Sequence, residues 1–324
     1  MSAYAKAKLS ARTIAELGET ALIRAIKHWL GPANRAAPLG IGDDCAVLPA
    51  AKGKQLVTVD PVIRGRHFDD SHPPRLVAEK LLKRSLSDIA AMGGVPTHAV
   101  IALSAPPGLP VVWLRDFFRG LGRCAHAHGV AIVGGDCTQT DGFLGAFLTL
   151  VGHNEKRVLT RDGGRAGDAL FVSGALGGSR LGRHARFTPR LAEGCWLARQ
   201  SGVHAAIDLS DGLGKDLAAL ARPGILALVE TGALPVSADA RRAARKDGRA
   251  LLDHMLNDGE DFELLFAVAA RRAQALERAW RRQFKTPLTR IGKLVAAPQA
   301  SRDRVRFDPP LPPSISAQGY EHFR

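Results

Sequence analysis

The sequence contains little cysteine and no long uninterrupted apolar run. Its four cysteines are widely spaced and form no CxxC pair, so neither a zinc ribbon nor a disulfide scaffold is expected. The apolar stretch at residues 99–114 is interrupted by a serine and by prolines. A membrane-spanning helix needs about 20 apolar residues in succession, so we expect neither a transmembrane protein nor a membrane partner.

The first residues also lack the pattern of a secretory signal. Lys6, Lys8 and Arg12 precede the first acid at Glu16, but they are not followed by an apolar region of about 7 to 15 residues. This predicts a mature, cytoplasmic chain.

Acidic residues are in the minority, because 31 Asp and Glu face 45 Lys and Arg, which gives a net charge of +14. Such a charge favours anionic partners, among them nucleic acids and phosphorylated small molecules. The dense basic run at residues 241–249 contains no aromatic side chain. A platform for single-stranded nucleic acid needs aromatic rings for base stacking. We therefore expect this run to be the solvated face of a helix, and we expect no nucleic-acid partner.

The common nucleotide-binding motifs are missing. The pairs Gly53-Lys54, Gly214-Lys215 and Gly292-Lys293 are each followed by a residue other than Ser or Thr, and no GxxxxGK[ST] pattern occurs. The HRD and DFG motifs of protein kinases are absent as well. A P-loop fold and a protein-kinase fold are both excluded.

Composition and apolar spacing predict an α/β protein of two domains. Hydrophobic residues make up 46% of the chain and charged residues 23%, as in globular proteins. Helices are expected at residues 11–30, 75–92 and 111–128, and strands at 55–60, 97–103, 130–133 and 143–151. After a Gly-rich passage, a second α/β unit is expected from segments at 205–213, 225–230, 260–268 and 271–284. The predicted domains are residues 1–155 and 156–324.

Acids lie at the ends of apolar segments or in glycine-containing turns, which is unexpected in so basic a protein. They are Asp43, Asp44, Asp60, Asp88, Asp136, Asp208, Asp211, Glu260 and Asp261. An ionised carboxylate beside apolar residues is costly unless it is paired or binds a cation. Each acid taken alone is more often a helix cap or a turn residue. Together they form an all-oxygen ligand set, which suits Mg²⁺ with water and substrate phosphates.

These acids belong to a series of motifs that resembles one known family. The motifs are, in order, GIGDDCAVL (40–48), VTVDPVIRGRHF (57–68), SLSDIAAMGGVP (85–96), VGGDCT (133–138), LTRDGGRAGDALFVSG (159–174), AIDLSDGL (206–213), GEDFELLF (259–266) and GYEHF (319–323). They resemble the thiamine-monophosphate kinases, which belong to a superfamily typified by aminoimidazole ribonucleotide synthetase. The resemblance implies a two-domain α/β (α+β) fold whose N-terminal sheet pairs across a homodimer. It also implies ATP-dependent phosphorylation of thiamine monophosphate over several Mg²⁺ ions.

The resemblance further implies roles for individual residues. Metal ligands would be Asp44, Thr58, Val59, Asp60, Asp88, Asp136, Asp208 and Asp211. Contacts to ATP would be made by Gly135, Asp136, Arg161 and Ser210. Contacts to the thiamine phosphate would be made by His67, Glu260 and Tyr320. The first domain would then bind ATP and metal and form the dimer, and the second would supply a tail that contacts the substrate.

Some positions depart from the family pattern or allow a second interpretation. Val59 stands where many members carry Thr, so it could bind a metal only through its backbone carbonyl. Asp258 replaces the first Gly of a GGED motif. His67 is equally able to serve as a structural hydrogen-bonder. The tail that carries Tyr320 is either loose or folded back over the site.

The chemistry of the acceptor predicts a simple mechanism. The second pKa of a phosphate monoester is about 6, so its oxygen is already ionised at neutral pH and needs no catalytic base. We therefore expect direct, metal-assisted transfer without a catalytic acid, base or nucleophile from the protein. The alternative is another ATP-dependent enzyme of the same superfamily, either selenophosphate synthetase-like or aminoimidazole ribonucleotide synthetase-like.

Overall fold

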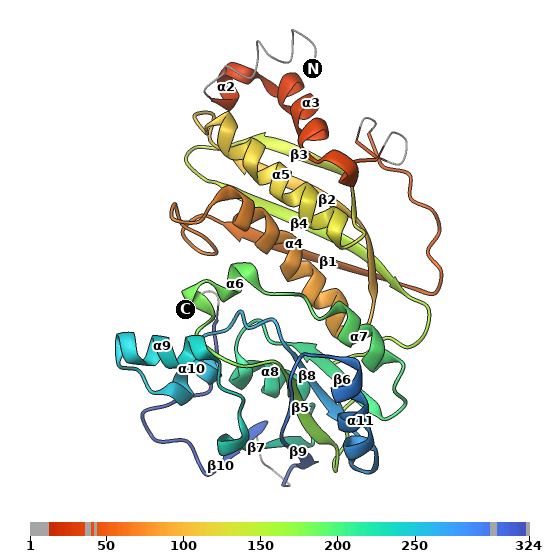
Figure 1. Ribbon diagram of the computed structural model, residues 1–324, viewed down its shortest axis with the longest axis vertical. Helices are drawn as coiled ribbons and strands as arrows, with labels where there is room; N and C mark the ends of the chain where they lie inside the picture. Colours follow the sequence, from red (N-terminus) through yellow and green to blue (C-terminus); the bar gives the residue numbers. More distant parts are fainter. Residues whose placement is uncertain (1–12, 36–39, 42–43, 299–302, 322–324) are drawn as a thin grey trace. The chain divides into compact units, whose positions relative to one another are not determined.

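Figure 1 shows the computed structural model of the chain, in which residues 13–35, 40–41, 44–298 and 303–321 are described. The chain divides into two compact units. The first comprises Met1–Leu86 and Val95–Glu155, and the second comprises Ser87–Gly94 and Lys156–Arg324. The end of helix α4 (Pro74–Ala91) thus belongs to the second unit, although it precedes residue 155 in the sequence.

The first unit is built on a four-stranded mixed sheet. Its described helices are α2 (Ile14–Leu17), α3 (Glu19–Trp29), the 3-10 turn η1 (Gly31–Ala33), α4 and α5 (Val111–Ala127). Its strands are β1 (Lys54–Ile63), β2 (Val95–Ala105), β3 (Ala131–Gln139) and β4 (Gly145–Asn154). The strand order is β1-β4-β2-β3, in which β2 and β3 are parallel and the other neighbours are antiparallel.

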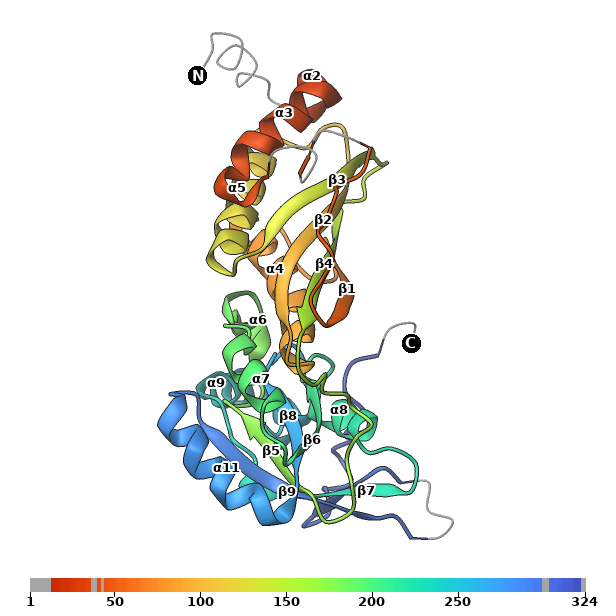
Figure 2. The ribbon, with the colours of Figure 1, turned by 90° about the vertical axis from the view of Figure 1, so that its right-hand side faces the viewer.

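Helices α4 and α5 cover only one face of this sheet, as Figure 2 shows. On α5, the buried residues Leu114, Phe117 and Leu121 recur at helical spacing and form its inner face. On the other face of the sheet, the β1 side chains Val57 and Val59 are 66% and 62% exposed. This unit therefore presents an apolar sheet surface.

The prediction of a single helix at residues 11–30 is wrong. Gly18 has φ of +75°, outside the helical region, and it separates α2 from α3. The apolar spacing continues across this break because Leu17, Leu22 and Ile26 are all buried. Periodicity alone could not show the turn.

The second unit is built on a six-stranded mixed sheet with the order β10-β7-β9-β5-β8-β6. Its strands are β5 (Ala169–Ser173), β6 (Val203–Asp208), β7 (Ile225–Glu230), β8 (Leu264–Val268), β9 (Leu288–Ala296) and β10 (Val305–Asp308). Its described helices and 3-10 turns are η2 (Ser179–Leu181), α6 (Arg183–Arg186), α7 (Leu191–Ala198), α8 (Leu213–Leu220), η3 (Thr231–Ala233), α9 (Ala238–Asp247), α10 (Leu251–Asn257) and α11 (Ala270–Gln283). Only β10 and β7 are parallel neighbours.

Both faces of the six-stranded sheet are covered. Strand β5 alternates, so that Leu170 enters a core with Leu217 of α8, while Phe171 enters a second core with Trp280 of α11. Full burial of one such side chain contributes about 1.5–3 kcal/mol. In the described ranges, no helix has the length and apolar character needed to cross a membrane.

Candidate functional site

Asp60 lies on β1, and its carboxylate is paired with a guanidinium of the same unit. Its Oδ1 accepts hydrogen bonds from Nε and Nη2 of Arg84 on α4, both at 3.3 Å. Its Oδ2 accepts a hydrogen bond from Oγ of Ser85 at 3.0 Å. Both side chains of the ion pair are only 16% exposed. The negative charge of Asp60 is therefore balanced by an arginine that is part of the fold.

Thr58 and Val59 precede Asp60 on the same strand. Successive side chains of a strand point to opposite faces, so Thr58 and Asp60 share one face. Val59 lies on the other, exposed face. A cation beside Asp60 could therefore meet Val59 only through its backbone, as expected for this position.

Gly135 and Asp136 lie on β3, where the backbone approaches β2 closely. Gly135 has φ of +153°, and a Cβ atom there would lie 2.0 Å from the carbonyl oxygen of Ile101, so only glycine fits. Asp136 is exposed, and its Oδ2 accepts a hydrogen bond from Oγ1 of Thr138 at 3.0 Å. Burial, with a smaller contribution from Asp136, raises the pKa of the Cys137 thiol to about 11. Cys137 is therefore protonated at neutral pH and is a poor nucleophile.

The sheet keeps Asp60 and Asp136 apart. They lie on β1 and β3, which are the two edges of the four-stranded sheet. Along the register, Asp60 faces Leu148, Leu148 faces Ile101, and Ile101 faces Gly135. Three interstrand steps of about 4.8 Å place the two strands on the order of 14 Å apart at this level. The sheet of one chain therefore does not bring these two carboxylates to one cation.

His67 and Asp44 are also in the first unit. Nδ1 of His67 accepts a hydrogen bond from the backbone N–H of Ile63 at 3.1 Å. Nζ of Lys80 donates to the carbonyl oxygen of His67 at 2.9 Å. His67 thus makes a hydrogen bond to the backbone, as expected if it has a structural role. Asp44 is exposed and lies before β1 in a segment without regular structure, whereas Asp43 lies outside the described residues.

In the second unit, the end of β6 approaches the end of α4. Asp208, the last residue of β6, is buried, and its Oδ2 accepts a hydrogen bond from Oγ of Ser87 at 2.8 Å. Asp88, the next residue of α4, is half-buried. Ser87 of the SLSD motif therefore meets the AIDLSD motif within the second unit.

Asp216 joins this group, although no motif singled it out. It lies in the first turn of α8, and its Oδ2 accepts a hydrogen bond from the backbone N–H of Asp211 at 3.2 Å. Burial, followed by the charges of Asp208 and Asp211, raises the pKa of Asp216 to about 8. Nζ of Lys215 lies 2.8 Å from Oδ2 of Asp211. The sequence signal that could have identified Asp216 is an acid in the first turn of the helix that follows the AIDLSDGL motif.

The donor set of this group fits a hard divalent cation. Burial and, after it, the charges of Asp208 and Asp211 disfavour the ionised form of Asp216 when no cation is present. Among the described residues, no group of three or more His, Cys, Asp or Glu side chains is placed so that it could hold a metal ion by itself. An open set of carboxylates is what Mg²⁺ uses when waters and substrate phosphates complete its coordination.

Glu260 lies in a loop with an unusual backbone. Glu260 and Phe262 both have φ of 51°, so the strand predicted at 260–268 begins only with β8. The N–H of Glu260 donates to the carbonyl oxygen of Ser210 at 2.7 Å, and that of Phe262 to Leu209 at 2.8 Å. Nδ1 of His184 lies 3.5 Å from Oε2 of Glu260. The loop is thus bonded directly to the segment that follows Asp208.

The C-terminal tail is bonded to the same segment. The N–H of Tyr320 donates to the carbonyl oxygen of Asp211 at 2.8 Å, and Nζ of Lys215 donates to the carbonyl oxygen of Tyr320 at 2.8 Å. Tyr320 is 37% exposed. The tail therefore lies beside Ser210 and Asp211 rather than loose.

Arg161 lies in the loop that precedes β5. Its side chain is exposed, and the carbonyl oxygen of its neighbour Thr160 accepts a hydrogen bond from the N–H of Ala206 on β6 at 3.1 Å. An exposed guanidinium is thus held by its backbone next to the strand that ends at Asp208.

Comparisons with known proteins agree with these motifs. Residues 42–153 match the family described as AIR synthase related protein, N-terminal domain. The thiamine-monophosphate kinase of Rhodopirellula baltica is 39% identical over 267 residues, which cover 79% of this chain and 83% of the relative. The crystal structure of thiamine-monophosphate kinase from Stenotrophomonas maltophilia K279a is 32% identical, with a TM-score of 0.73, and the match covers 88% of this chain and 94% of that chain. The structure of AaThiL complexed with AMPPCP and TMP is 31% identical, with a TM-score of 0.73 and coverage of 95% and 98%.

Proposed function

The chain belongs to the thiamine-monophosphate kinases, enzymes that make thiamine diphosphate from thiamine monophosphate and ATP, and on this premise we propose that it transfers the γ-phosphoryl group directly, assisted by carboxylate-held Mg²⁺. The expected two-domain α/β fold of the AIR synthase-related type is confirmed. The relatives from R. baltica and S. maltophilia are both thiamine-monophosphate kinases, so the comparisons do not favour a selenophosphate synthetase-like or aminoimidazole ribonucleotide synthetase-like activity.

The gathering of acids at the end of β6 carries the metal part of this proposal: Ser87, the neighbour of Asp88, donates to the buried Asp208, and the N–H of Asp211 donates to Asp216. The ligands in the second unit would be Asp88, Asp208 and Asp211, with Asp216 beside them as a carboxyl group that a bound cation would favour in its ionised form. The ligands in the first unit would be Asp44, Thr58, Val59, Asp60 and Asp136. When bound, Mg²⁺ would neutralise the phosphate oxygens between which the transfer occurs.

The remaining site residues would hold the two substrates. We assign ATP contacts to Gly135, Asp136, Arg161 and Ser210, because Gly135 and Asp136 are exposed on β3 and Arg161 offers an exposed guanidinium to phosphate. We assign thiamine-phosphate contacts to His67, Glu260 and Tyr320. The AaThiL complex with AMPPCP and TMP supports the presence of both substrate sites.

Direct transfer requires no proton to be taken from the acceptor. An ionised oxygen of thiamine monophosphate forms the new bond to the γ-phosphorus, the bond from that phosphorus to the oxygen bridging to the β-phosphate breaks, and ADP leaves. The protonated state of Cys137 supports this route, because the thiol next to Asp136 is not an activated nucleophile. The task of the protein is to hold two polyanions in line.

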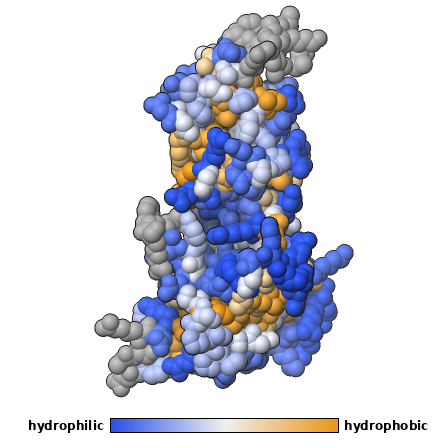
Figure 3. All heavy atoms as spheres, turned by 90° about the vertical axis from the view of Figure 1, so that its left-hand side faces the viewer, coloured by the Kyte–Doolittle hydropathy of each residue, from blue (hydrophilic) through white to orange (hydrophobic). Residues whose placement is uncertain are grey.

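A homodimer formed through the uncovered sheet face belongs to the same proposal. Val57, Val59 and Val100 are exposed, and Figure 3 shows apolar atoms at the surface of the first unit. A second copy that closes on this sheet could also bring opposite sheet edges together and so unite Asp60 of one chain with Asp136 of the other. Val57→Asp is expected to give a monomer in sedimentation experiments, and an unchanged dimer would argue against this interface.

A coupled ADP-release assay tests the function itself. Thiamine monophosphate, thiamine and an aminoimidazole precursor are offered as alternative acceptors, with and without Mg²⁺. We expect ADP only with thiamine monophosphate and Mg²⁺. ADP release with another acceptor would overturn the assignment, and isolation of a substrate-competent ³²P-labelled enzyme from γ-labelled ATP would overturn direct transfer.

A further inference from the structure

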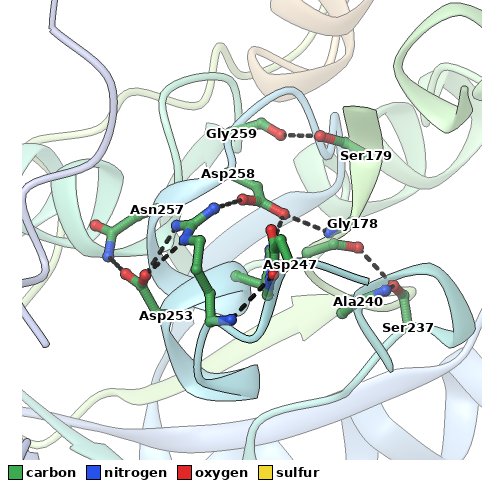
Figure 4. A network of polar contacts seen from close by, with 12 residues as sticks. Gly178, Ser179, Ser237, Ala240, Asp247, Asp253, Asn257, Asp258 and Gly259 are labelled. Atoms are coloured by element: carbon green, nitrogen blue, oxygen red, sulfur yellow. Dashed lines mark hydrogen bonds and ion pairs between the residues drawn. The ribbon is translucent and has the colours of Figure 1, made fainter. Parts of the chain in front are cut away.

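A polar network surrounds the C-terminal end of α10 (Figure 4). Asp258, which follows the helix, is buried, and its Oδ2 accepts hydrogen bonds from the N–H of Gly178 at 2.8 Å and from Nδ1 of His254 at 2.9 Å. Its Oδ1 accepts a hydrogen bond from Nη1 of Arg249 at 3.2 Å. The carboxylate that replaces a family glycine thus has partners from three segments.

His254 links Asp258 to a second acid. Its side chain is 2% exposed, and Nε2 lies 3.2 Å from Oδ1 of Asp247. Both ring nitrogens therefore lie within hydrogen-bond distance of carboxylate oxygens. Asp258 is thereby paired with the guanidinium of Arg249 and hydrogen-bonded to His254.

Asn257, next to Asp258, connects the network to the C-terminal tail. Its Nδ2 donates to Oδ1 of Asp253 and to the carbonyl oxygen of Ser316, both at 2.6 Å. Its Oδ1 accepts a hydrogen bond from the N–H of Gly319 at 2.9 Å. The side chain thus holds the tail at the residue directly before Tyr320.

The loop on the other side of Asp258 needs such anchoring. The left-handed backbone of Glu260 is strained for a residue with a side chain, and it persists only where the surroundings enforce it. Oγ of Ser179 donates to the carbonyl oxygen of Gly259 at 2.6 Å. The loop is therefore also held at Gly259, which lies between Asp258 and Glu260. Asp258 adds a buried side-chain anchor to the backbone hydrogen bonds that Glu260 and Phe262 make with Ser210 and Leu209.

We propose that Asn257 and Asp258 are positioning residues for the acceptor site: Asp258, held by His254, fixes the loop that carries Glu260, and Asn257 fixes the tail that carries Tyr320. One short helix end thereby sets the spacing between the two side chains. This inference rests on the proposed contacts of Glu260 and Tyr320 with thiamine monophosphate.

The test compares Asn257→Ala and His254→Gln with a matched control, His204→Gln. His204 is also a largely buried histidine of the second unit, with Nδ1 at 2.8 Å from Oδ2 of Asp168, but it lies at the start of β6 rather than beside α10. We expect Asn257→Ala and His254→Gln each to raise the KM for thiamine monophosphate about tenfold, with the KM for ATP changed by less than about twofold. His204→Gln is expected to lower the Tm without changing either KM.

A double variant distinguishes positioning from general loosening. If Asn257 acts through the tail, the KM of the double variant Asn257→Ala/Tyr320→Ala for thiamine monophosphate should be close to that of Tyr320→Ala alone. Fully additive effects, equal changes in both KM values, or no change in either would overturn the inference. A parent enzyme inactive toward thiamine monophosphate would instead overturn the proposed function, and this is measured first.

Discussion

Two carboxylates from the two units meet opposite electrostatic surroundings. Asp60 of the first unit faces the guanidinium of Arg84, whereas Asp216 of the second unit is buried near Asp208 and Asp211 and has a pKa raised to about 8. The first unit supplies its own cation as part of the fold. In the second unit Lys215 pairs with Asp211, but Asp216 lies buried beside two further acids, and this is where we propose that a cation from solution binds.

The largest effect is expected from removing a carboxylate in the second unit. Asp208→Asn should lower kcat by about a thousandfold, or about 4 kcal/mol, because the amide is a poor Mg²⁺ ligand. In metal-free buffer its Tm should not fall, since the amide oxygen still accepts from Ser87 and the repulsion of Asp216 is relieved. Asp168→Asn serves as the control, because it weakens the buried pair of Asp168 with His204. In contrast to Asp208→Asn, it should lower the Tm and leave kcat nearly unchanged. A large loss of Tm in Asp208→Asn would reassign Asp208 to a structural role.

Next in size is the dependence of stability on pH without metal. The pKa of Asp216 rises from 3.8 to about 8 on folding, so the folded state holds a proton that the unfolded state releases between these values. The free energy of unfolding should therefore fall as the pH rises through this window. Compared with Asp216→Asn, the parent protein should lose about 1.4 kcal/mol of its free energy of unfolding for each pH unit within this window. Urea unfolding of both proteins in EDTA between about pH 5 and 7 measures this difference. Parallel pH profiles would contradict a raised pKa of Asp216 in the folded protein.

Asp60→Asn should behave differently from Asp208→Asn in metal-free buffer. The guanidinium of Arg84, whose side chain is only 16% exposed, would then face a neutral amide instead of a carboxylate. The free energy of unfolding should therefore fall by about 1–3 kcal/mol. Replacing both residues, as in Asp60→Asn with Arg84→Met, should recover part of this loss. An undiminished stability of the single variant would remove the contrast between the two units.

The smallest effect is expected at the tail. Tyr320→Ala should raise the KM for thiamine monophosphate between twofold and thirtyfold and leave the KM for ATP nearly unchanged, because an aromatic face contributes about 0.5–2 kcal/mol to binding a planar cation. Truncation before Gly319 should act in the same way. Equal effects on both substrates would place Tyr320 outside the acceptor site.

Much of the fold could be predicted from apolar periodicity. The helix expected at 75–92 is α4 (Pro74–Ala91), and the strand expected at 143–151 is β4 (Gly145–Asn154). The failures fall where backbone conformation departs from a regular period. Gly18 interrupts the first helix, and the left-handed backbone of Glu260 delays β8, yet neither disturbs the apolar pattern.

The site was predictable only in part, because motifs give residue types and not their neighbours. The acids at the ends of apolar segments were recognised, and the structure brings Asp208 to the residue beside Asp88. The order of strands is not encoded in any local pattern, so the separation of Asp60 and Asp136 on opposite sheet edges was not foreseen. Asp216 was missed because its importance depends on burial beside other acids.

Mg²⁺-dependent stabilisation tests the central claim most directly. The Tm of the parent and of Asp208→Asn is measured at about pH 8 with EDTA and then with increasing Mg²⁺, without nucleotide. At a concentration of about 100 times Kd, binding should stabilise the parent by about 2.7 kcal/mol, equivalent to several degrees. We expect this rise in the parent and in Asp168→Asn and its loss in Asp208→Asn. No rise in the parent, or an equal rise in Asp208→Asn, would contradict the account.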